Sequence, residues 1–264
     1  MIKNFNRLLS FILITSFFAL FLVFSLFWYF SSDLPDFAFL KTYKPAVSTK
    51  VYDIKGDVIA DFSRERRSFI NIDQVPKRVV SAFLSAEDKN FYKHPGIDAI
   101  GITRAVFKNI ENFVTGKRLE GASTITQQVA KNFLLTSDVS LARKVKEAIL
   151  AFRIEKSLSK KRILELYLNE IYLGERSYGI ASASMTYFDK SINDINFSEA
   201  ALLAALPKAP SKYNPYRNYD AVKQRKNWVL KRMYENKFIT KKQLETSLKY
   251  KIKLKKRLLI MDMS

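Results

Sequence analysis

A long apolar stretch stands at the N-terminus. Residues 8–30 carry no charged side chain, and about 20 predominantly apolar residues are enough to cross a bilayer as a helix. Lys3 and Arg7 precede the stretch, and Asp33 and Asp36 follow it. Because basic residues are retained on the cytoplasmic side, we expect an uncleaved anchor with the N-terminus inside and the body outside. The alternative is a cleaved signal peptide, but its apolar core would be shorter, and no small-residue cleavage site follows.

The hydrophobic pattern changes after this stretch, first to a strand-like and then to a helical period. β-branched and aromatic residues around a glycine predict a small hairpin at residues 48–62. Pro76 then opens a helix that ends near Glu87. A Pro-Gly pair at 95–96 breaks the chain before Asp98 caps the next helix.

Apolar spacing predicts further helices downstream. Ile125, Val129 and Phe133 recur every four residues and form one buried stripe. Thr124 and Gln127 have the spacing of a capping box, so this helix starts there. The later helices are predicted at residues 140–154, 159–174 and 198–206, and as two basic helices within 221–250.

The helix that starts at Ser140 is apolar on two sides, which predicts burial on both. We expect the first of these sides to face the core as the inner stripe, and the second to be polar at one end and apolar at the other. The inner stripe is Leu141, Val145, Ala148 and Phe152, and the second side is Arg143, Glu147, Leu150 and Ile154. Arg143 and Glu147 would then be paired or face a ligand. The alternative is an exposed ion pair worth about 0.2–0.5 kcal/mol.

Composition limits the chemistry. After the anchor, the 264-residue chain suits one domain, and its 7 glycines and 7 prolines favour a mostly helical body. The absence of cysteine excludes disulfides and thiolate zinc sites, and the single histidine, His94, excludes multi-histidine metal sites. The formal net charge of +20 predicts an anionic partner. Composition alone does not choose between nucleic acid, acidic lipid and a phosphorylated substrate.

Two segments carry candidate chemistry. In the first, Glu87 and Asp88 stand at a helix end beside aromatic residues, where a carboxylate can enter a cleft. Two ordinary surface acids would look the same in isolation. In the second, the helix start after Gly121 would offer free N–H groups to an anion, and Lys131 lies one turn beyond Gln128. A structural interpretation of this second segment needs only a capped helix.

Five blocks of sequence follow one another in a recognisable order and cover roughly residues 50–240. They are Glu87-Asp-Lys-Asn-Phe-Tyr-Lys-His94-Pro-Gly96, Gly121-Ala-Ser-Thr-Ile-Thr-Gln-Gln128, Arg143-Lys-Val-Lys-Glu147, Lys161-Arg-Ile-Leu-Glu-Leu-Tyr-Leu-Asn169-Glu-Ile-Tyr-Leu-Gly174 and Ala200-Ala-Leu-Leu-Ala-Ala-Leu-Pro207. Together they resemble the peptidoglycan glycosyltransferase domain of class A penicillin-binding proteins, glycosyltransferase family 51. One block would mean little, but five in family order are specific.

The resemblance implies a mainly α, lysozyme-like domain with a membrane-facing jaw, preceded by one transmembrane helix and a short β-hairpin. It implies an enzyme that polymerises lipid II into glycan strands and releases undecaprenyl pyrophosphate, for bacterial cell-wall synthesis. Glu87 matches the general base, which takes the proton of the attacking 4-hydroxyl, and Glu147 matches the donor-side glutamate that helps the pyrophosphate leave. The residues implied to bind substrate are Asp88, Ser123, Thr124, Gln127, Gln128, Lys131, Arg143, Lys144 and Asn169. Spacing alone would make Asn169 structural.

The resemblance also implies partners and a location. The catalytic domain would lie on the outer, periplasmic side of the bacterial cytoplasmic (inner) membrane. Its partners would be lipid II, the growing glycan strand and an assembly of cell-wall synthesis proteins, and not nucleic acid. No cofactor is implied as a fixed requirement, although some family members use a divalent cation, Mg²⁺ or Mn²⁺, beside the pyrophosphate. No separate metal-ligand motif is visible. Moenomycin, a phosphoglycolipid that inhibits this family at the donor site, should bind.

The expected organisation departs from the class A proteins at its end. It is a cytoplasmic tail (1–7), a transmembrane anchor (8–30), a linker with the β-hairpin (31–62), the glycosyltransferase domain (63–250) and an unassigned tail (251–264), with no transpeptidase domain. Ser157-Leu-Ser-Lys160 matches a transpeptidase Ser-x-x-Lys, but it falls at a helix junction, and we interpret it as a capping segment.

Several alternatives stay open. The chain is a natural one-function enzyme, a deliberate truncation or a frameshifted remnant. Its function is the polymerase activity, a lysozyme-like cleavage of glycan, or that of a truncated inactive remnant acting as a membrane scaffold.

Overall fold

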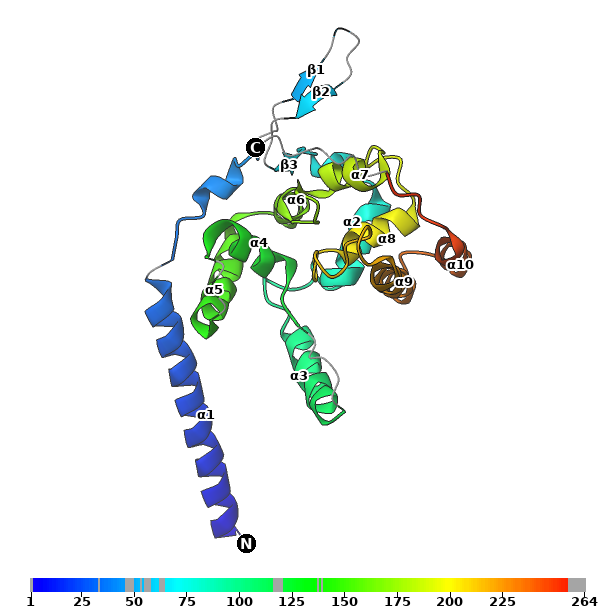
Figure 1. Ribbon diagram of the computed structural model, residues 1–264. Helices are drawn as coiled ribbons and strands as arrows, with labels where there is room; N and C mark the ends of the chain where they lie inside the picture. The colour runs from blue at the N-terminus through cyan, green and yellow to red at the C-terminus, as the bar shows by residue number, and fades with distance from the viewer. Residues whose placement is uncertain are drawn as a thin grey trace.

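The computed structural model describes residues 2–32, 34–45, 50–52, 54, 58–61, 65–115, 121–136, 138 and 140–255. The body is helical, and one long helix leaves it at the N-terminus (Figure 1). The helices are α1 (Ile2–Ser31), α2 (Lys77–Glu87), α3 (Ala99–Val114), α4 (Ile125–Leu134), α5 (Leu141–Ser157), α6 (Lys160–Glu170), α7 (Ile180–Phe188), α8 (Phe197–Ala205), α9 (Tyr219–Glu235) and α10 (Lys241–Lys249). Two short 3-10 helices are η1 (Ala38–Lys41) and η2 (Ile72–Gln74). The mainly α fold class is confirmed. Most of the unassigned tail, residues 256–264, lies outside the described residues.

Four short strands form two small sheets. The strands β1 (Lys50–Tyr52) and β2 (Val58–Asp61) pair antiparallel, with Val51 opposite Ala60. They confirm the predicted hairpin, whose turn at 55–57 lies outside the described residues. The strands β3 (Arg66–Arg67) and β4 (Ser177–Tyr178) pair parallel and join the segment before α2 to the one before α7.

The helix α1 contains the predicted anchor. Within it, Leu13–Ser31 is a stretch of 19 residues with a mean hydropathy of 2.1, long and apolar enough to cross a membrane. The end of α1 lies against α5, where the guanidinium of Arg153 donates to the carbonyl of Ser31 at 3.3 Å and to its hydroxyl. The anchor is therefore joined to the body by contacts as well as by the chain.

The linker after α1 (residues 34–45) is held to α6 by Arg162. This guanidinium donates to the carbonyl of Leu40 at 2.9 Å and to that of Tyr43 at 2.6 Å, and it also pairs with Glu165 on α6. Leu40 is fully buried, and the Tyr43 hydroxyl donates to Glu170 at 2.8 Å. The linker is thus a docked segment rather than a loose tether.

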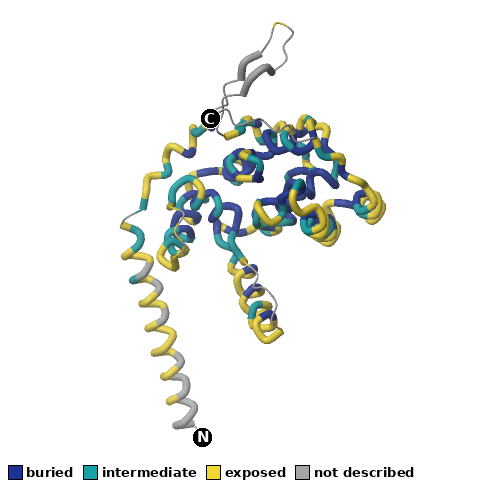
Figure 2. The backbone as a smooth tube through the Cα atoms, in the orientation of Figure 1, coloured by how far each residue is buried: buried dark blue, intermediate teal, exposed yellow. Residues whose placement is uncertain are grey.

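The core forms around α8, the helix that the Ala-Leu-rich block predicts. Its residues from Ser198 to Ala205 are all buried, and α2 and α9 pack against it (Figure 2). A second group is α4 packed on α5 and α6. The predicted stripe of α4 lies in this core with Ile125 and Val129 fully buried, and Ile163 and Leu168 of α6 are fully buried there too.

The predicted inner stripe of α5 is wrong. Leu141 is 83% exposed and Phe152 is 37% exposed, whereas Glu147, Leu150 and Ile154 on the other side are fully buried. Spacing cannot tell which of two apolar sides faces the core, because both have the same period. In the fold, α4 and α6 cover the side that carries Glu147.

The apolar stripe of α3 forms the predicted helix but is left uncovered. Ile100 is 77% exposed, Phe107 is 70% exposed and Phe113 is 82% exposed. Figure 1 shows α3 projecting from the body on the same side as α1, and Figure 2 shows it largely exposed. Uncovered apolar side chains on a projecting helix mark a contact surface, in keeping with the expected membrane-facing jaw.

Candidate active site

Glu87 is the last residue of α2 and points toward α4. Pro76 begins α2, and Glu87 stands one turn after the fully buried Phe83. The Glu87 Oε2 accepts a hydrogen bond from the Gln128 Nε2 at 2.8 Å. The side chain of Glu87 is partly buried. The first and second predicted blocks therefore meet at this carboxyl group.

The surroundings of Glu87 favour its neutral form. Burial raises the pKa of this carboxyl above its ordinary value, and the nearby charge of Asp88 raises it further. The hydrogen bond from Gln128 and the positive charges of Arg225 and Lys208 oppose this rise but do not cancel it. A carboxylate with a raised pKa is a stronger base, so Glu87 suits proton abstraction.

Asp88 is buried within the protein. It is 6% exposed, and both of its oxygens lie 3.0 Å from the Nε2 of His94. Its Oδ2 also accepts the backbone N–H of Ile125, the first residue of α4, at 3.1 Å. The Nδ1 of His94 accepts from Gly96, which leaves the Nε2 hydrogen for Asp88. Asp88 therefore joins α2, the His94 loop and α4, and we assign it a positioning role rather than the predicted contact with substrate.

The start of α4 is closed by its own cap. The capping box of Thr124 and Gln127 is present, and the Thr124 hydroxyl donates to the carbonyl of Gly96 at 2.6 Å. Gly96 has a φ of +97°, and an added Cβ would lie 2.7 Å from the Ala151 carbonyl, so only glycine fits there. The expectation of free N–H groups at this helix start is wrong for Ile125 and Gln127, because Asp88 and Thr124 accept from them.

A second carboxylate, Glu147, is surrounded by cations on α5. Its side chain is fully buried, and the Arg143 Nε lies 3.3 Å from its Oε1. Lys144 pairs with its Oε2 and also donates to the Ser123 hydroxyl at 2.8 Å. Lys131 on α4 is partly buried and has no ion pair within the described part of the chain. The prediction that Arg143 and Glu147 are desolvated and paired is confirmed.

The beginning of α4 links the two glutamates. The Lys144 ammonium donates both to the Ser123 hydroxyl and to Glu147. Five positions after Ser123, the Gln128 side chain donates to Glu87. Glu87 and Glu147 thus approach one helix end from α2 and α5. One has a raised pKa and suits a base, and the other anchors cations that suit a departing anion.

Besides Asp88 and Thr124, two further predicted substrate residues have side chains that already bond within the fold. The Asn169 Oδ1 accepts from Ile70 N at 2.8 Å, and its Nδ2 donates to the carbonyls of Ile70 and Glu165. Gln127 is 7% exposed, and its side chain is used in the capping box of α4. We therefore correct both assignments to structural roles. For Asn169, this agrees with what spacing alone indicates.

Three groups near Glu87 escaped the sequence reasoning. Arg225 on α9 and Lys208 after α8 act on Glu87 from the far end of the chain, where only basic composition was apparent. The third group is Tyr167, a buried core residue of α6. Nothing in local spacing distinguishes a phenol from other core residues.

The interpretation of Ser157-Leu-Ser-Lys160 as a capping segment is confirmed. The Ser159 side chain caps α6 by accepting from Arg162 N at 3.2 Å. Lys160 pairs with Glu155 and donates to the carbonyl of His94 at 2.7 Å. Lys160 therefore has a structural role.

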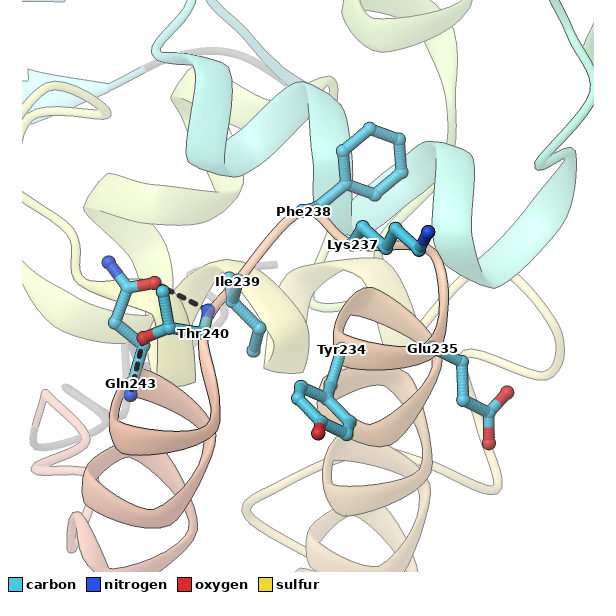
Figure 3. A pocket seen from close by; sticks show the side chains of 7 residues that line it. All are labelled: Tyr234, Glu235, Lys237, Phe238, Ile239, Thr240 and Gln243. Carbon is cyan, nitrogen blue, oxygen red and sulfur yellow. Dashed lines mark hydrogen bonds between the residues drawn. The ribbon is translucent and has the colours of Figure 1, made fainter.

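A pocket of about 420 Å³ lies at the turn between α9 and α10 (Figure 3). It is lined by Tyr234, Glu235, Lys237, Phe238, Ile239, Thr240 and Gln243. Figure 3 shows Thr240 and Gln243 joined by the capping bonds of α10. None of the predicted site residues lines the pocket, so we do not assign it to the reaction.

The described residues do not fit a protein-held metal. Among them, no group of three or more His, Cys, Asp or Glu side chains could hold an ion. Glu147 is engaged by two cations and Asp88 by His94 and a backbone N–H. We derive no step through a metal, and the predicted divalent cation stays a prediction.

Comparison with known proteins places this geometry in a family. A family model described as Transglycosylase matches residues 55–234. Penicillin-binding protein 1A of Rickettsia felis is 48% identical over 230 residues, which is 87% of this chain and 29% of that protein. The corresponding proteins of Aquifex aeolicus and Neisseria flavescens are 46% and 50% identical over 85% and 82% of this chain, and over 30% and 27% of their own lengths.

The chain thus spans less than a third of the length of these relatives. A solved structure of penicillin-binding protein 1A from Haemophilus influenzae is 27% identical over 81% of this chain and 22% of that chain, with a TM-score of 0.47, too low to support an argument about the fold. The family match covers more than half of the chain and includes all five blocks. The chain therefore belongs to the transglycosylase family.

Proposed function

We propose that this chain is a peptidoglycan glycosyltransferase, which polymerises lipid II into glycan strands and releases undecaprenyl pyrophosphate. The observation that carries the proposal is the pair of glutamates at the start of α4, with the raised pKa of Glu87 on one side and the Arg143–Lys144 cluster at Glu147 on the other. The names of the relatives, penicillin-binding protein 1A, support the same class of enzyme.

In the proposed reaction, Glu87 takes the proton of the 4-hydroxyl on the acceptor sugar. The freed oxygen attacks the anomeric carbon of the donor, whose bond to pyrophosphate breaks, and the pyrophosphate leaves with the bonding electrons. A carboxylate within hydrogen-bond reach contributes roughly 10²–10⁴-fold as general base. The raised pKa of Glu87 makes the abstraction of the proton easier.

The leaving group is anionic, so cations near it stabilise the transition state. Arg143, Lys144 and Lys131 are the proposed contacts, and Ser123 positions Lys144 through its hydroxyl. Glu147 keeps the two α5 cations in place because its buried carboxylate pairs with both. Gln128 holds Glu87.

The lipid part of the substrate requires a membrane beside the site. We propose a single-pass protein of the bacterial cytoplasmic membrane, with α1 as the anchor, its N-terminus inside and the body on the outer side. Lys3 and Arg7 before the span support this orientation. The exposed apolar residues of α3, on the side from which α1 leaves, support a body that rests on the bilayer.

The deciding experiment incubates the full chain with lipid II in detergent or vesicles and separates the glycan chains formed. Wild type should give polymer, and Glu87→Gln should lose roughly 10²–10⁴-fold in rate while remaining folded, with a melting temperature no lower than that of wild type. Release of fragments from finished sacculi, with no polymer from lipid II, would favour a glycan-cleaving enzyme. A folded chain that forms no polymer and releases no fragments would favour a scaffold.

A further inference from the structure

The hydroxyl of Tyr167 is a buried polar group without a partner. Tyr167 is 1% exposed, and within the described residues its oxygen has no hydrogen-bond partner. A buried phenol usually finds an acceptor, because an unpaired hydroxyl in the interior is costly. An orphaned hydroxyl beside a catalytic group is therefore a candidate for a bond made only in one state of that group.

Tyr167 packs against α2 one helical turn before Glu87. Its ring meets Phe83 edge-on, with centroids 6.2 Å apart. Phe83 precedes Glu87 by four residues on α2, so both lie on one face of that helix. The helix α6, which carries Tyr167, also packs against α4, which carries Gln128. Tyr167 thus contacts the helix that carries Glu87 and belongs to a helix that packs against the one that carries Gln128.

Two carboxyl groups, Glu87 and Asp88, act on this phenol. Burial and the charges of both raise the pKa of Tyr167 well above its usual value, so the hydroxyl remains a donor at all relevant pH. Both oxygens of Asp88 are already engaged by His94, and one also by Ile125. Glu87 accepts one hydrogen bond from the residues that the structure describes, that of Gln128, and is therefore the carboxyl with room for another donor.

We propose that Tyr167 is a positioning residue for the general base: its hydroxyl donates to the Glu87 carboxylate when Glu87 is ionised. This inference rests on the proposed function. The bond stabilises the ionised base and fixes its orientation before the acceptor hydroxyl arrives. The other groups that face Glu87 are Asp88 on α2, Gln128 on α4, Arg225 on α9 and Lys208 after α8, and none of them changes when Tyr167 is altered.

The test is Tyr167→Phe, which removes only the hydroxyl. Loss of a donor to the ionised form raises the pKa of Glu87, so the acid limb of the polymerisation rate should move to higher pH by about half a unit to one unit. At pH above the limb, the rate should approach that of wild type. Within the described residues the hydroxyl has no other partner, so the melting temperature should not fall at low pH, where Glu87 is neutral, and should fall only at pH above the limb, where the bond to ionised Glu87 is lost.

The matched control is Tyr187→Phe. Tyr187 is also fully buried, but its hydroxyl donates to the Leu173 carbonyl at 2.8 Å, far along the chain from Glu87. This variant should melt at a lower temperature with an unchanged acid limb. An unmoved limb in Tyr167→Phe, or an equal movement in both variants, would overturn the proposal.

A second readout separates this inference from the proposed function. The pKa of Glu87 is measured by ¹³C NMR of labelled glutamate carboxyls, with the Glu87→Gln variant identifying the signal. A higher pKa in Tyr167→Phe supports the inference even if wild type makes no polymer, and an equal pKa refutes it. Absence of polymer from wild type counts against the proposed function alone.

Discussion

Two adjacent carboxyl groups, Glu87 and Asp88, have different surroundings at the end of α2. Asp88 accepts a backbone N–H of α4 and pairs with His94, so its charge is used to join three segments. Glu87 accepts one hydrogen bond and has a raised pKa. The last residue of a helix also meets the negative end of the helix dipole, which disfavours a carboxylate. Ionised Glu87 therefore lowers the stability of the folded chain, and the bonds of Asp88 offset part of that loss.

This cost predicts a stabilising substitution. Because the pKa of Glu87 is raised in the folded chain, its contribution to stability is complete below the ordinary glutamate pKa and is lost as pH rises through the raised value. Glu87→Gln should therefore melt above wild type at neutral pH and equal to it at low pH. Glu245→Gln, at an exposed position of α10, is the control and should show no such difference. A Glu87→Gln variant that melts lower at neutral pH would contradict the prediction.

At the scale of elements, α4 and α5 make the donor side, but their cations differ in how far the fold depends on them. Arg143 and Lys144 neutralise the buried Glu147, whereas Lys131 has no ion pair among the residues that the structure describes. Removing one partner of a buried pair leaves a charge uncompensated and is strongly destabilising. Substitutions on the two helices should therefore separate binding from stability.

We expect Lys131→Ala to weaken moenomycin binding and polymerisation without lowering the melting temperature. We expect Arg143→Ala to lower all three, because it also removes one of the two cations that pair with the buried Glu147. The measurements are direct binding of labelled moenomycin and thermal unfolding of both variants. Unchanged moenomycin affinity in Lys131→Ala would remove this lysine from the donor site.

The elements also show what the sequence could and could not predict. Helix positions, the caps at Thr124 and Ser159 and the paired Arg143–Glu147 follow from local spacing and charge. The buried side of α5 does not, because two apolar sides of one helix look alike until a neighbour covers one of them. The role of Asp88 and the approach of Arg225 to Glu87 depend on contacts between distant segments, which spacing does not record.

At the scale of the whole molecule, α1 and α3 leave the body on one side (Figure 1). The uncovered apolar residues of α3 would lie against the bilayer that α1 crosses, and burying one large apolar side chain contributes about 1.5–3 kcal/mol. In the proposed function, the lipid substrate would arrive from the same surface. A substitution on the exposed apolar face of α3 should therefore lower the reaction rate in lipid vesicles but not in detergent.

Phe107→Asp is the test of this arrangement. Phe107 is 70% exposed, so the substitution should leave folding and the rate in detergent intact. In lipid vesicles, the rate should fall on the order of 10-fold, since an inserted aspartate opposes seating of α3. Phe238→Asp, at an exposed phenylalanine of the α9–α10 turn, is the control. Equal losses in detergent and vesicles would point to a defect in the fold instead.

The docked linker between α1 and the body has a consequence for encounter with substrate. Twelve residues free to extend could reach about 40 Å, and the cleft would then sample a large volume above the membrane. Arg162 instead fixes Leu40 and Tyr43 to α6, and Arg153 fixes Ser31 to α5. With that freedom removed, these contacts set the height of Glu87 relative to the end of α1, and so its effective concentration at that height. In the proposed function, the protein and its lipid-borne substrate would then meet by diffusion in two dimensions rather than three.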